Sequence, residues 1–383
     1  MIGLFFGVCL AVLVVFVGYD ALSALIERFS HFHIGRWKSQ SQWETAVEAV
    51  CRKWAVKTPV LRLRSDCRYL LLDRLRGKNG KAAVQSWQKA GCLLGLEADA
   101  EKNAETLNAA EARLLNPDGA WSKPLLEKVD VGMLAYALLK HTDHPEKIRT
   151  AMDQVAEVME KNLCKDGMIS YSMGQKSDRR FVDTLGFVCP FLAAYGKIYG
   201  RPEYAAMAVD QLKLFHDEGI AYGLPVHCYK KDGCIPLGVY GWGRGAGWYA
   251  LGLIDTYPEL ENIGDKAWLR ACIEETAESL KVYERQEGGF SSILQDFGNY
   301  DSSATAMLGY FYARCAELFQ REEYLDIARR CCGRLQHVTK ISGVIDECQG
   351  DTLGVGVFST RYGSMPFAQG MTLRLLTILK SEA

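Results

Sequence analysis

The chain of 383 residues carries 45 lysines and arginines against 46 aspartates and glutamates, so its formal net charge is −1. This balance, without a long basic block, argues against a protein that binds nucleic acid through bulk positive charge. Hydrophobic residues make up 49% of the chain, which is enough to form a large buried core.

The N-terminal segment contains no charged residue from Ile2 to Tyr19, and its apolar character continues to Ile26. A helix of this length can cross a bilayer. A cleaved signal peptide is the alternative, but no Lys or Arg precedes the apolar run and no small-residue cleavage site follows it. We therefore predict a transmembrane anchor over residues 1–26.

The flanks of this segment predict its orientation. Arg28, Arg36 and Lys38 follow the apolar run, which places the rest of the chain in the cytoplasm by the positive-inside tendency. The 13 cysteines are odd in number and lack framework spacing, as is typical of reduced thiols. Cys331 and Cys332 are adjacent, but there is no CxxC pair, and we predict no metal site.

A turn signature recurs along the chain from about residue 115 onward. In each copy, an acidic or polar residue and a glycine follow an amphipathic stretch and lead into a short extended piece. The glycines stand at positions 119, 167, 219, 288 and 343. A supersecondary unit that recurs every 50 to 70 residues or so indicates a repeat fold.

Helical spacing of the apolar residues predicts about twelve helices between and before these turns. In chain order they are 43–54, 67–75, 82–96, 131–139, 149–163, 182–199, 204–215, 245–257, 268–283, 303–319, 324–335 and 368–379. Twelve helices in hairpins of about fifty residues close naturally into an all-α (α/α)6 barrel. An open α-solenoid is the alternative, but solenoid repeats usually resemble one another, whereas these share only the turn. We predict one barrel domain over 41–383, joined to the anchor by a connector over 27–40.

The stretch from Gly241 to Tyr249 holds the densest cluster of unusual residues, including Trp242, Arg244 and Trp248. Glycines allow close backbone packing, and an arginine framed by tryptophans can pair with a carboxylate beside a flat stacking surface. Those groups suit a uronic acid. A glycine-rich helix entry with buried tryptophans is the structural alternative. The missing Lys-Ser/Thr ending argues against a nucleotide-binding loop.

Two aspartates stand at the starts of very apolar helices. Asp183 opens the predicted helix 182–199, and Asp130 stands in the same relation to helix 131–139. Aspartate is also a good helix cap, which is the structural alternative here and the expected role of Asp265 and Asp301. Two acids at the same end of neighbouring hairpins would converge in the central cavity. Their proximity would raise the proton affinity of one carboxyl and leave the other charged.

Three stretches, in this order, resemble the signature blocks of glycoside hydrolase families 88 and 105. They are Val182 to Phe187 with Pro190, Trp242 to Trp248, and Ser302 to Met307. The resemblance implies an (α/α)6 barrel that removes a 4,5-unsaturated uronic acid from the non-reducing end of oligosaccharides left by polysaccharide lyases. The implied reaction hydrates a vinyl ether and needs no metal or organic cofactor.

The resemblance also implies roles for single residues. Asp183 is implied as the general acid that protonates C4 and handles the water added at C5, with Asp130 as its partner. Arg244 and Trp248 correspond to carboxylate and stacking contacts, with Trp242 as the second framing tryptophan. His227 falls where the family has a substrate-binding imidazole, although a lone loop histidine is more often structural.

The predicted anchor leaves a second hypothesis open. Most relatives are soluble or exported, so a membrane-tethered version could instead be a non-catalytic glycan-binding or scaffold protein in surface polysaccharide metabolism. Retention of both acids and of the Arg/Trp pair favours the enzyme.

Overall fold

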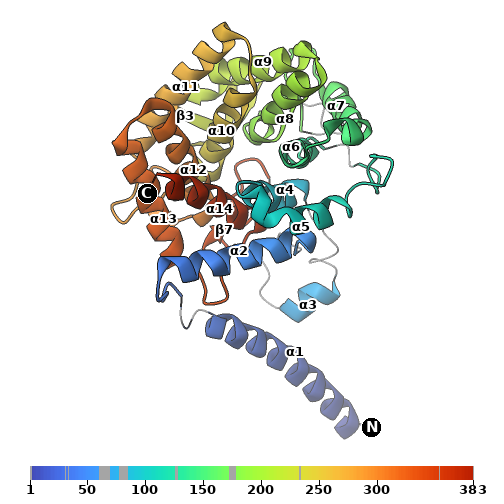
Figure 1. Ribbon diagram of the computed structural model, residues 1–383. Coiled ribbons are helices and arrows are strands. Elements are labelled where there is room, and N and C mark those ends of the chain that lie inside the picture. Colours follow the sequence, from blue (N-terminus) through green and yellow to red (C-terminus); the bar gives the residue numbers. More distant parts are fainter. Residues whose placement is uncertain are drawn as a thin grey trace.

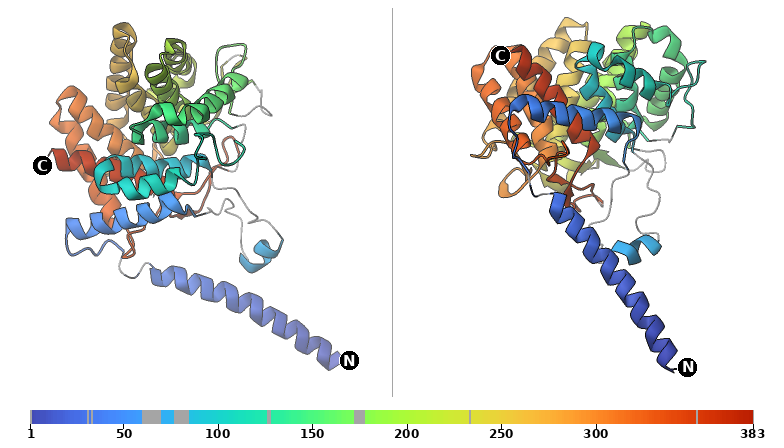
Figure 2. Two further views of the ribbon diagram at one scale, coloured as in Figure 1. Left: turned by 45° about the vertical axis from the view of Figure 1, so that its right-hand side comes forward. Right: turned by 60° about the horizontal axis from the view of Figure 1, so that its bottom comes forward.

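The computed structural model describes residues 2–30, 32, 34–59, 70–76, 85–125, 128–171, 178–232, 234–352 and 354–382. Helix α1 (Ile2–Ser30) extends away from the main body, with the N terminus at its outer end (Figures 1 and 2). Its stretch Ile2–Ile26 is long and apolar enough to cross a membrane, and its apolar window is 0% buried. The helix continues to Ser30, into the stretch predicted as a connector.

Twelve helices of the described chain form two rings around one axis (Figure 1). The inner ring consists of α4 (Ser86–Glu97), α6 (Val131–His141), α8 (Asp183–Tyr199), α10 (Gly243–Thr256), α12 (Ser302–Phe319) and α14 (Pro366–Ser381). Each inner helix packs against the next, and α14 returns to α4. The outer ring consists of α2 (Gln40–Val56), α5 (Ala100–Glu111), α7 (Arg149–Asn162), α9 (Pro202–Gly219), α11 (Ile263–Lys281) and α13 (Glu322–His337). The predicted (α/α)6 barrel is therefore confirmed.

The closure of the inner ring depends on glycines where α4 meets α14. A Cβ atom on Gly95 would lie 2.4 Å from the carbonyl oxygen of Gly370. One on Gly370 would lie 1.8 Å from the carbonyl oxygen of Gly91. Because no side chain separates them, the first and last inner helices approach backbone to backbone.

All six inner helices begin at one end of the barrel, which we call the mouth, because outer and inner helices alternate along the chain. Short antiparallel strands occupy the connections that lead to these starts. They are β1 (Arg179–Phe181), β2 (Ile220–Ala221), β3 (Leu224–Lys230), β4 (Ile235–Tyr240), β5 (Ser291–Ile293), β6 (Asp296–Tyr300), β7 (Cys348–Gln349) and β8 (Tyr362–Gly363). β3 pairs with β1, β2 and β4, while β5–β6 and β7–β8 form two-stranded sheets.

A buried ion pair joins three of the inner helices. Arg374 of α14 donates from both terminal nitrogens to the Asp255 carboxylate at the end of α10, at 2.7 and 2.8 Å. Tyr310 of α12 donates to the same carboxylate at 2.8 Å. A bidentate, fully partnered pair of this kind fixes three inner helices relative to one another.

The recurring turn is present at four of the five predicted glycines. These four adopt positive φ angles between 79° and 84°, a region that favours glycine: Gly119, Gly167, Gly288 and Gly343. At the fifth, Gly219 ends α9 and leads into the short strand β2, and the left-handed turn follows at Tyr222 and Gly223.

The predicted set of barrel helices included 67–75, which is not part of either ring, and lacked α5 (Ala100–Glu111). Helix α5 was missed because it buries only three residues, Asn103, Leu107 and Ala110, and so lacks a wide apolar stripe. Of the predicted helix 67–75, the structure describes α3 (Leu70–Leu75), a short helix outside both rings (Figure 1). Residues 67–69, and residues 82–84 of another predicted helix, lie outside the described part of the chain.

The predicted caps were partly correct. Asp301 caps α12 by accepting from the Ser303 amide at 2.8 Å. Asp265 does not cap α11. Asn262 does so instead, accepting from the Asp265 amide at 3.0 Å, because α11 begins earlier than the apolar pattern indicates.

Candidate active site

Asp183 lies at the mouth as the first residue of α8. Its Oδ1 is buried without a hydrogen-bond partner among the described residues. An unpartnered buried oxygen is costly to the folded protein. Burial raises the pKa of Asp183 to about 7, while the positive charge of Arg244 opposes and the negative charge of Asp351 reinforces this shift.

Asp130 directly precedes α6 and is buried, with 5% of its surface exposed. It does not cap its own helix. Its Oδ2 instead accepts from the Ser86 amide at 2.9 Å, at the start of α4. Burial raises the pKa of Asp130 to about 6, and the Ser86 amide opposes the shift because it stabilises the charged form. Asp130 therefore links two inner helices and holds a carboxylate at the mouth.

The structure adds three residues that the sequence analysis did not identify: Gln85, Tyr171 and Asp351. Asp351 follows β7, and its Oδ2 accepts from the Gln85 side chain at 2.8 Å. Burial, followed by the charges of Asp130, Asp183 and Asp351, raises the pKa of Tyr171 well above its usual range. The negative charges of all three acids therefore act on the Tyr171 hydroxyl. We call Gln85, Asp130, Tyr171, Asp183 and Asp351 the mouth cluster.

Arg244 lies in the first turn of α10 and is 1% exposed. Its Nη1 donates to the Gln349 carbonyl at 2.6 Å and to the Ser303 hydroxyl at 3.2 Å, and Nη2 donates to the Gly350 carbonyl at 2.9 Å. The guanidinium therefore fixes the segment that precedes Asp351. Its pairing with a substrate carboxylate stays a prediction.

The two tryptophans around Arg244 are each 2% exposed. The ring of Trp248 packs against Trp87, Phe187 and Phe367, with centroid distances between 4.6 and 5.4 Å. Trp242 donates from its indole nitrogen to the Gln349 side chain at 3.0 Å. These contacts are those expected of buried tryptophans at a glycine-rich helix entry, the structural alternative given above. Stacking of either ring on a sugar stays a prediction.

His227 lies on β3, beside the start of α8, because its carbonyl accepts from the Val182 amide at 3.1 Å. Its ring packs against Trp242 and Phe358, at centroid distances of 4.7 and 5.4 Å. Burial, reinforced by the charge of Arg244, lowers the pKa of His227 to about 4. The imidazole is therefore neutral at physiological pH and can act as a hydrogen-bonding group.

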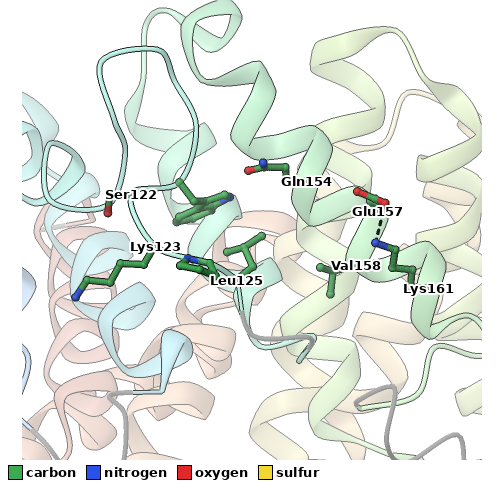
Figure 3. A pocket seen from close by; sticks show the side chains of 9 residues that line it. Ser122, Lys123, Leu125, Gln154, Glu157, Val158 and Lys161 are labelled. Carbon is green, nitrogen blue, oxygen red and sulfur yellow. Dashed lines mark ion pairs between the residues drawn. The ribbon is translucent and has the colours of Figure 1, made fainter.

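A separate pocket of about 440 Å³ lies on the flank of the barrel, between residues 121–125 and α7 (Figure 3). Lys161 and Glu157 form an ion pair of 2.7 Å at its wall (Figure 3). No member of the mouth cluster lines this pocket. The mouth brings together two aspartates with raised pKa values and a histidine with a lowered one, and it is therefore the candidate active site.

Comparison with known proteins identifies the family. The family model described as Glycosyl Hydrolase Family 88 matches residues 101–377. The chain belongs to this family. The resemblance inferred from the three sequence blocks is thus confirmed, and both candidate acids lie within the matched region.

Several known proteins are similar to this chain. Protein Atu3128 of Agrobacterium fabrum is 31% identical over 147 residues, which cover 34% of this chain and 60% of that protein. A possible family 105 member from Salmonella enterica aligns with a TM-score of 0.71 at 19% identity, over 89% of this chain and 94% of that structure. The unsaturated glucuronyl hydrolase from Bacillus sp. GL1 aligns at 0.60 and 16% identity, over 89% and 95% respectively. These structural likenesses support the fold.

Proposed function

We propose that this family 88 member removes a 4,5-unsaturated uronic acid from the non-reducing end of oligosaccharides. The observation that carries the proposal is the Asp183 carboxyl, which has an unpartnered buried oxygen and a pKa raised to about 7. A carboxyl that retains its proton near neutral pH is suited to general acid catalysis.

In the proposed reaction, Asp183 gives its proton to C4 of the unsaturated sugar. Water then adds at C5, and the Asp183 carboxylate accepts a proton from this water, which restores the acid. The resulting hemiketal opens and expels the aglycone. Asp130, with its lower pKa of about 6, supplies the charged partner at the same mouth.

The substrate carboxylate would be bound at the start of α10. We propose Arg244 as its cationic partner and Trp242, Trp248 and His227 as the surrounding contacts. The starts of the inner helices support this role, because the positive ends of six helix dipoles face the mouth and favour an anionic sugar.

We further propose that α1 anchors the protein in a membrane, with residues 1–26 as the anchor, 27–40 as a connector and 41–383 as a cytoplasmic catalytic domain. The apolar and unburied stretch Ile2–Ile26 supports the anchor. A signal sequence shares this length and composition, whereas the basic residues that follow α1 favour retention with the barrel in the cytoplasm.

The direct test is incubation of the purified protein with lyase-generated oligosaccharides while the absorbance of the unsaturated bond is followed. We expect a time-dependent loss of absorbance and release of the aglycone. An Asp183→Asn control prepared in the same way should leave the absorbance constant. Glycan binding without turnover by the wild-type protein would instead favour the non-catalytic binding or scaffold function.

A further inference from the structure

The chain is fixed to the barrel almost directly after α1. The Gly35 amide donates to the Thr339 carbonyl at 2.9 Å, and Trp43 of α2 donates from its indole nitrogen to the Thr339 hydroxyl at 2.9 Å. A Cβ atom on Gly35 would lie 2.3 Å from the His337 carbonyl oxygen, so the two backbones are in direct contact. Trp37, between Gly35 and Trp43 in the chain, packs against the core. The stretch predicted as a connector is therefore docked on the barrel from Gly35 onward.

This docking point lies at the mouth end of the barrel. Thr339 follows α13, an outer helix, and the outer helices end where the inner helices begin. Only residues 31–34 separate Gly35 from the end of α1 at Ser30, and a fully extended chain of this length spans at most about 18 Å. The proposed membrane anchor thus holds the mouth end, and not the opposite end, close to the bilayer.

A second part of the mouth end also meets α1. Helix α3 stands in the connection that leads to the start of α4, on the same side of the barrel as α1 (Figures 1 and 2). The Leu71 amide of α3 donates to the Asp20 carboxylate of α1 at 3.1 Å. Asp20 is the one charged residue within Ile2–Ile26. Two connections at the mouth end are therefore held at the anchor, which limits how far the mouth can turn away from the bilayer.

Exposed apolar side chains gather at the mouth end. Within the described part of the barrel, only Ile198 and Ile263 among the exposed large apolar residues lie at the opposite end, where inner helices end and outer helices begin. We call six of those in the connections at the mouth end the rim: Tyr222, Ile235, Val239, Val282, Ile341 and Val357. Exposed apolar groups mark contacts with a membrane or a partner, and tyrosine is enriched at membrane interfaces. The rim and the anchor thus indicate the same partner, a lipid bilayer.

The proposed reaction determines which end of the glycan faces the rim. The sugar at the non-reducing end enters the mouth, so the reducing end of the glycan points outward, past the rim. A lyase cleaves by β-elimination, which places the double bond on the fragment that keeps the original reducing end. If that end carries a lipid, the unsaturated fragment remains in the membrane.

We propose that the rim rests on the bilayer and that the substrate is an unsaturated glycan held in the same membrane by a lipid at its reducing end. This inference rests on the proposed function, because it uses both the removal of the terminal sugar and the membrane anchor. It adds the surface that the mouth end contacts and the chemical class of the substrate. Confining the protein and the glycan to one membrane raises the effective concentration of the glycan at the mouth.

The contact of the rim with the bilayer is tested on the full chain in phosphatidylcholine vesicles, without substrate. Val282 and Ile263 stand at opposite ends of the outer helix α11, with 67% and 85% of their surfaces exposed. Val282→Cys and Ile263→Cys are each labelled with a fluorophore, and a nitroxide-labelled lipid serves as the quencher. The parent protein, in which the exposed Cys9 and Cys234 are replaced by serine, gives the background. We expect strong quenching at position 282 and little at position 263. Equal quenching at the two positions, or stronger quenching at 263, would overturn the inference.

The substrate class is tested with one unsaturated uronyl disaccharide in two forms. Its reducing end is coupled either to a dialkylglycerol in the vesicles or to a methyl group in solution. We expect the wild-type protein in the same vesicles to turn over the lipid-linked form at least about tenfold faster at equal total concentration. Val282→Asp/Ile341→Asp should lose most of this advantage and keep the turnover of the methyl form, because charges in the rim resist transfer into an apolar interface. The matched control Ile198→Asp/Ile263→Asp, at the opposite end, should retain the advantage.

The two forms of the disaccharide separate the inference from the proposed function. Equal turnover of both forms by the wild-type protein, or an advantage that the rim variant retains, would overturn the inference and leave the proposed function standing. No turnover of either form would overturn the proposed function and the substrate class with it. The quenching result would then still decide whether the rim contacts the bilayer.

Discussion

The two candidate acids differ in what holds them at the mouth. Asp130 is tied to the start of α4 by the Ser86 amide, whereas Asp183 retains a buried oxygen without a partner. The amide hydrogen bond stabilises a charged carboxylate, and burial stabilises a protonated one. This difference gives the acid role to Asp183 and the charged role to Asp130.

The difference predicts a bell-shaped dependence of kcat/KM on pH. Burial raises both pKa values, to about 6 for Asp130 and about 7 for Asp183. Activity should rise with pH as Asp130 loses its proton near 6 and fall as Asp183 loses its proton near 7.

The check is a pH profile of kcat/KM between about pH 4.5 and 9, with Asp130→Asn as comparison. Asp130→Asn should lose the acidic limb and keep the alkaline one. A wild-type profile that stays flat through pH 8 would contradict the assignment of Asp183 as the acid.

At the scale of the elements, the role of the recurring turns in stability can be tested by adding one methyl group to a turn glycine. Gly343 has a φ of +83°, and a Cβ atom there would lie 2.3 Å from the Ala46 carbonyl oxygen on α2. Gly343→Ala should therefore lower the free energy of unfolding by about 1–3 kcal/mol, through backbone strain and displacement of α2.

The matched control is Gly333→Ala, because Gly333 lies inside α13 and a Cβ atom there meets nothing within 4 Å. This change should be neutral or stabilise the protein by up to about 1 kcal/mol. Both values are measured by urea denaturation. Similar effects from the two substitutions would argue against the turn as the determinant.

The helices differ in how well the apolar pattern of the sequence predicted them. Helices with wide apolar stripes, such as α8 and α12, were located to within a residue or two. Helix α5 was not predicted because its buried face is narrow and includes only three residues. Asp351 and Tyr171 escaped for another reason: both stand in connections between helices, and their approach to Asp183 depends on ring closure, which leaves no local pattern in the sequence.

At the scale of the whole molecule, the barrel and α1 are expected to be separable. The apolar window of α1 is 0% buried, so its removal costs the barrel little packing. Deletion of residues 2–30 should move the protein from the membrane fraction to the soluble fraction and leave the melting temperature within about 2 °C. A deleted protein that still sediments with membranes would show that α1 is not the anchor.

The orientation of the barrel is tested with the full chain. Protease added to intact cells should leave the barrel undigested, because the basic residues after α1 place it in the cytoplasm. Lysis before digestion provides the control. Cleavage without lysis would reverse the predicted orientation.

The central claim, that Asp183 is a general acid, is tested most directly by the turnover of Asp183→Asn per folded molecule. General acid catalysis contributes about 10²- to 10⁴-fold, so loss of absorbance from the unsaturated bond should slow by at least about a hundredfold. The melting temperature at pH 8 should not fall: the pKa of Asp183 is raised in the folded protein, so its ionised form opposes folding above about pH 7, and asparagine removes that charge. A variant that turns over normally per folded molecule, or that is destabilised with its turnover intact, would show that Asp183 has a structural role and would contradict the account.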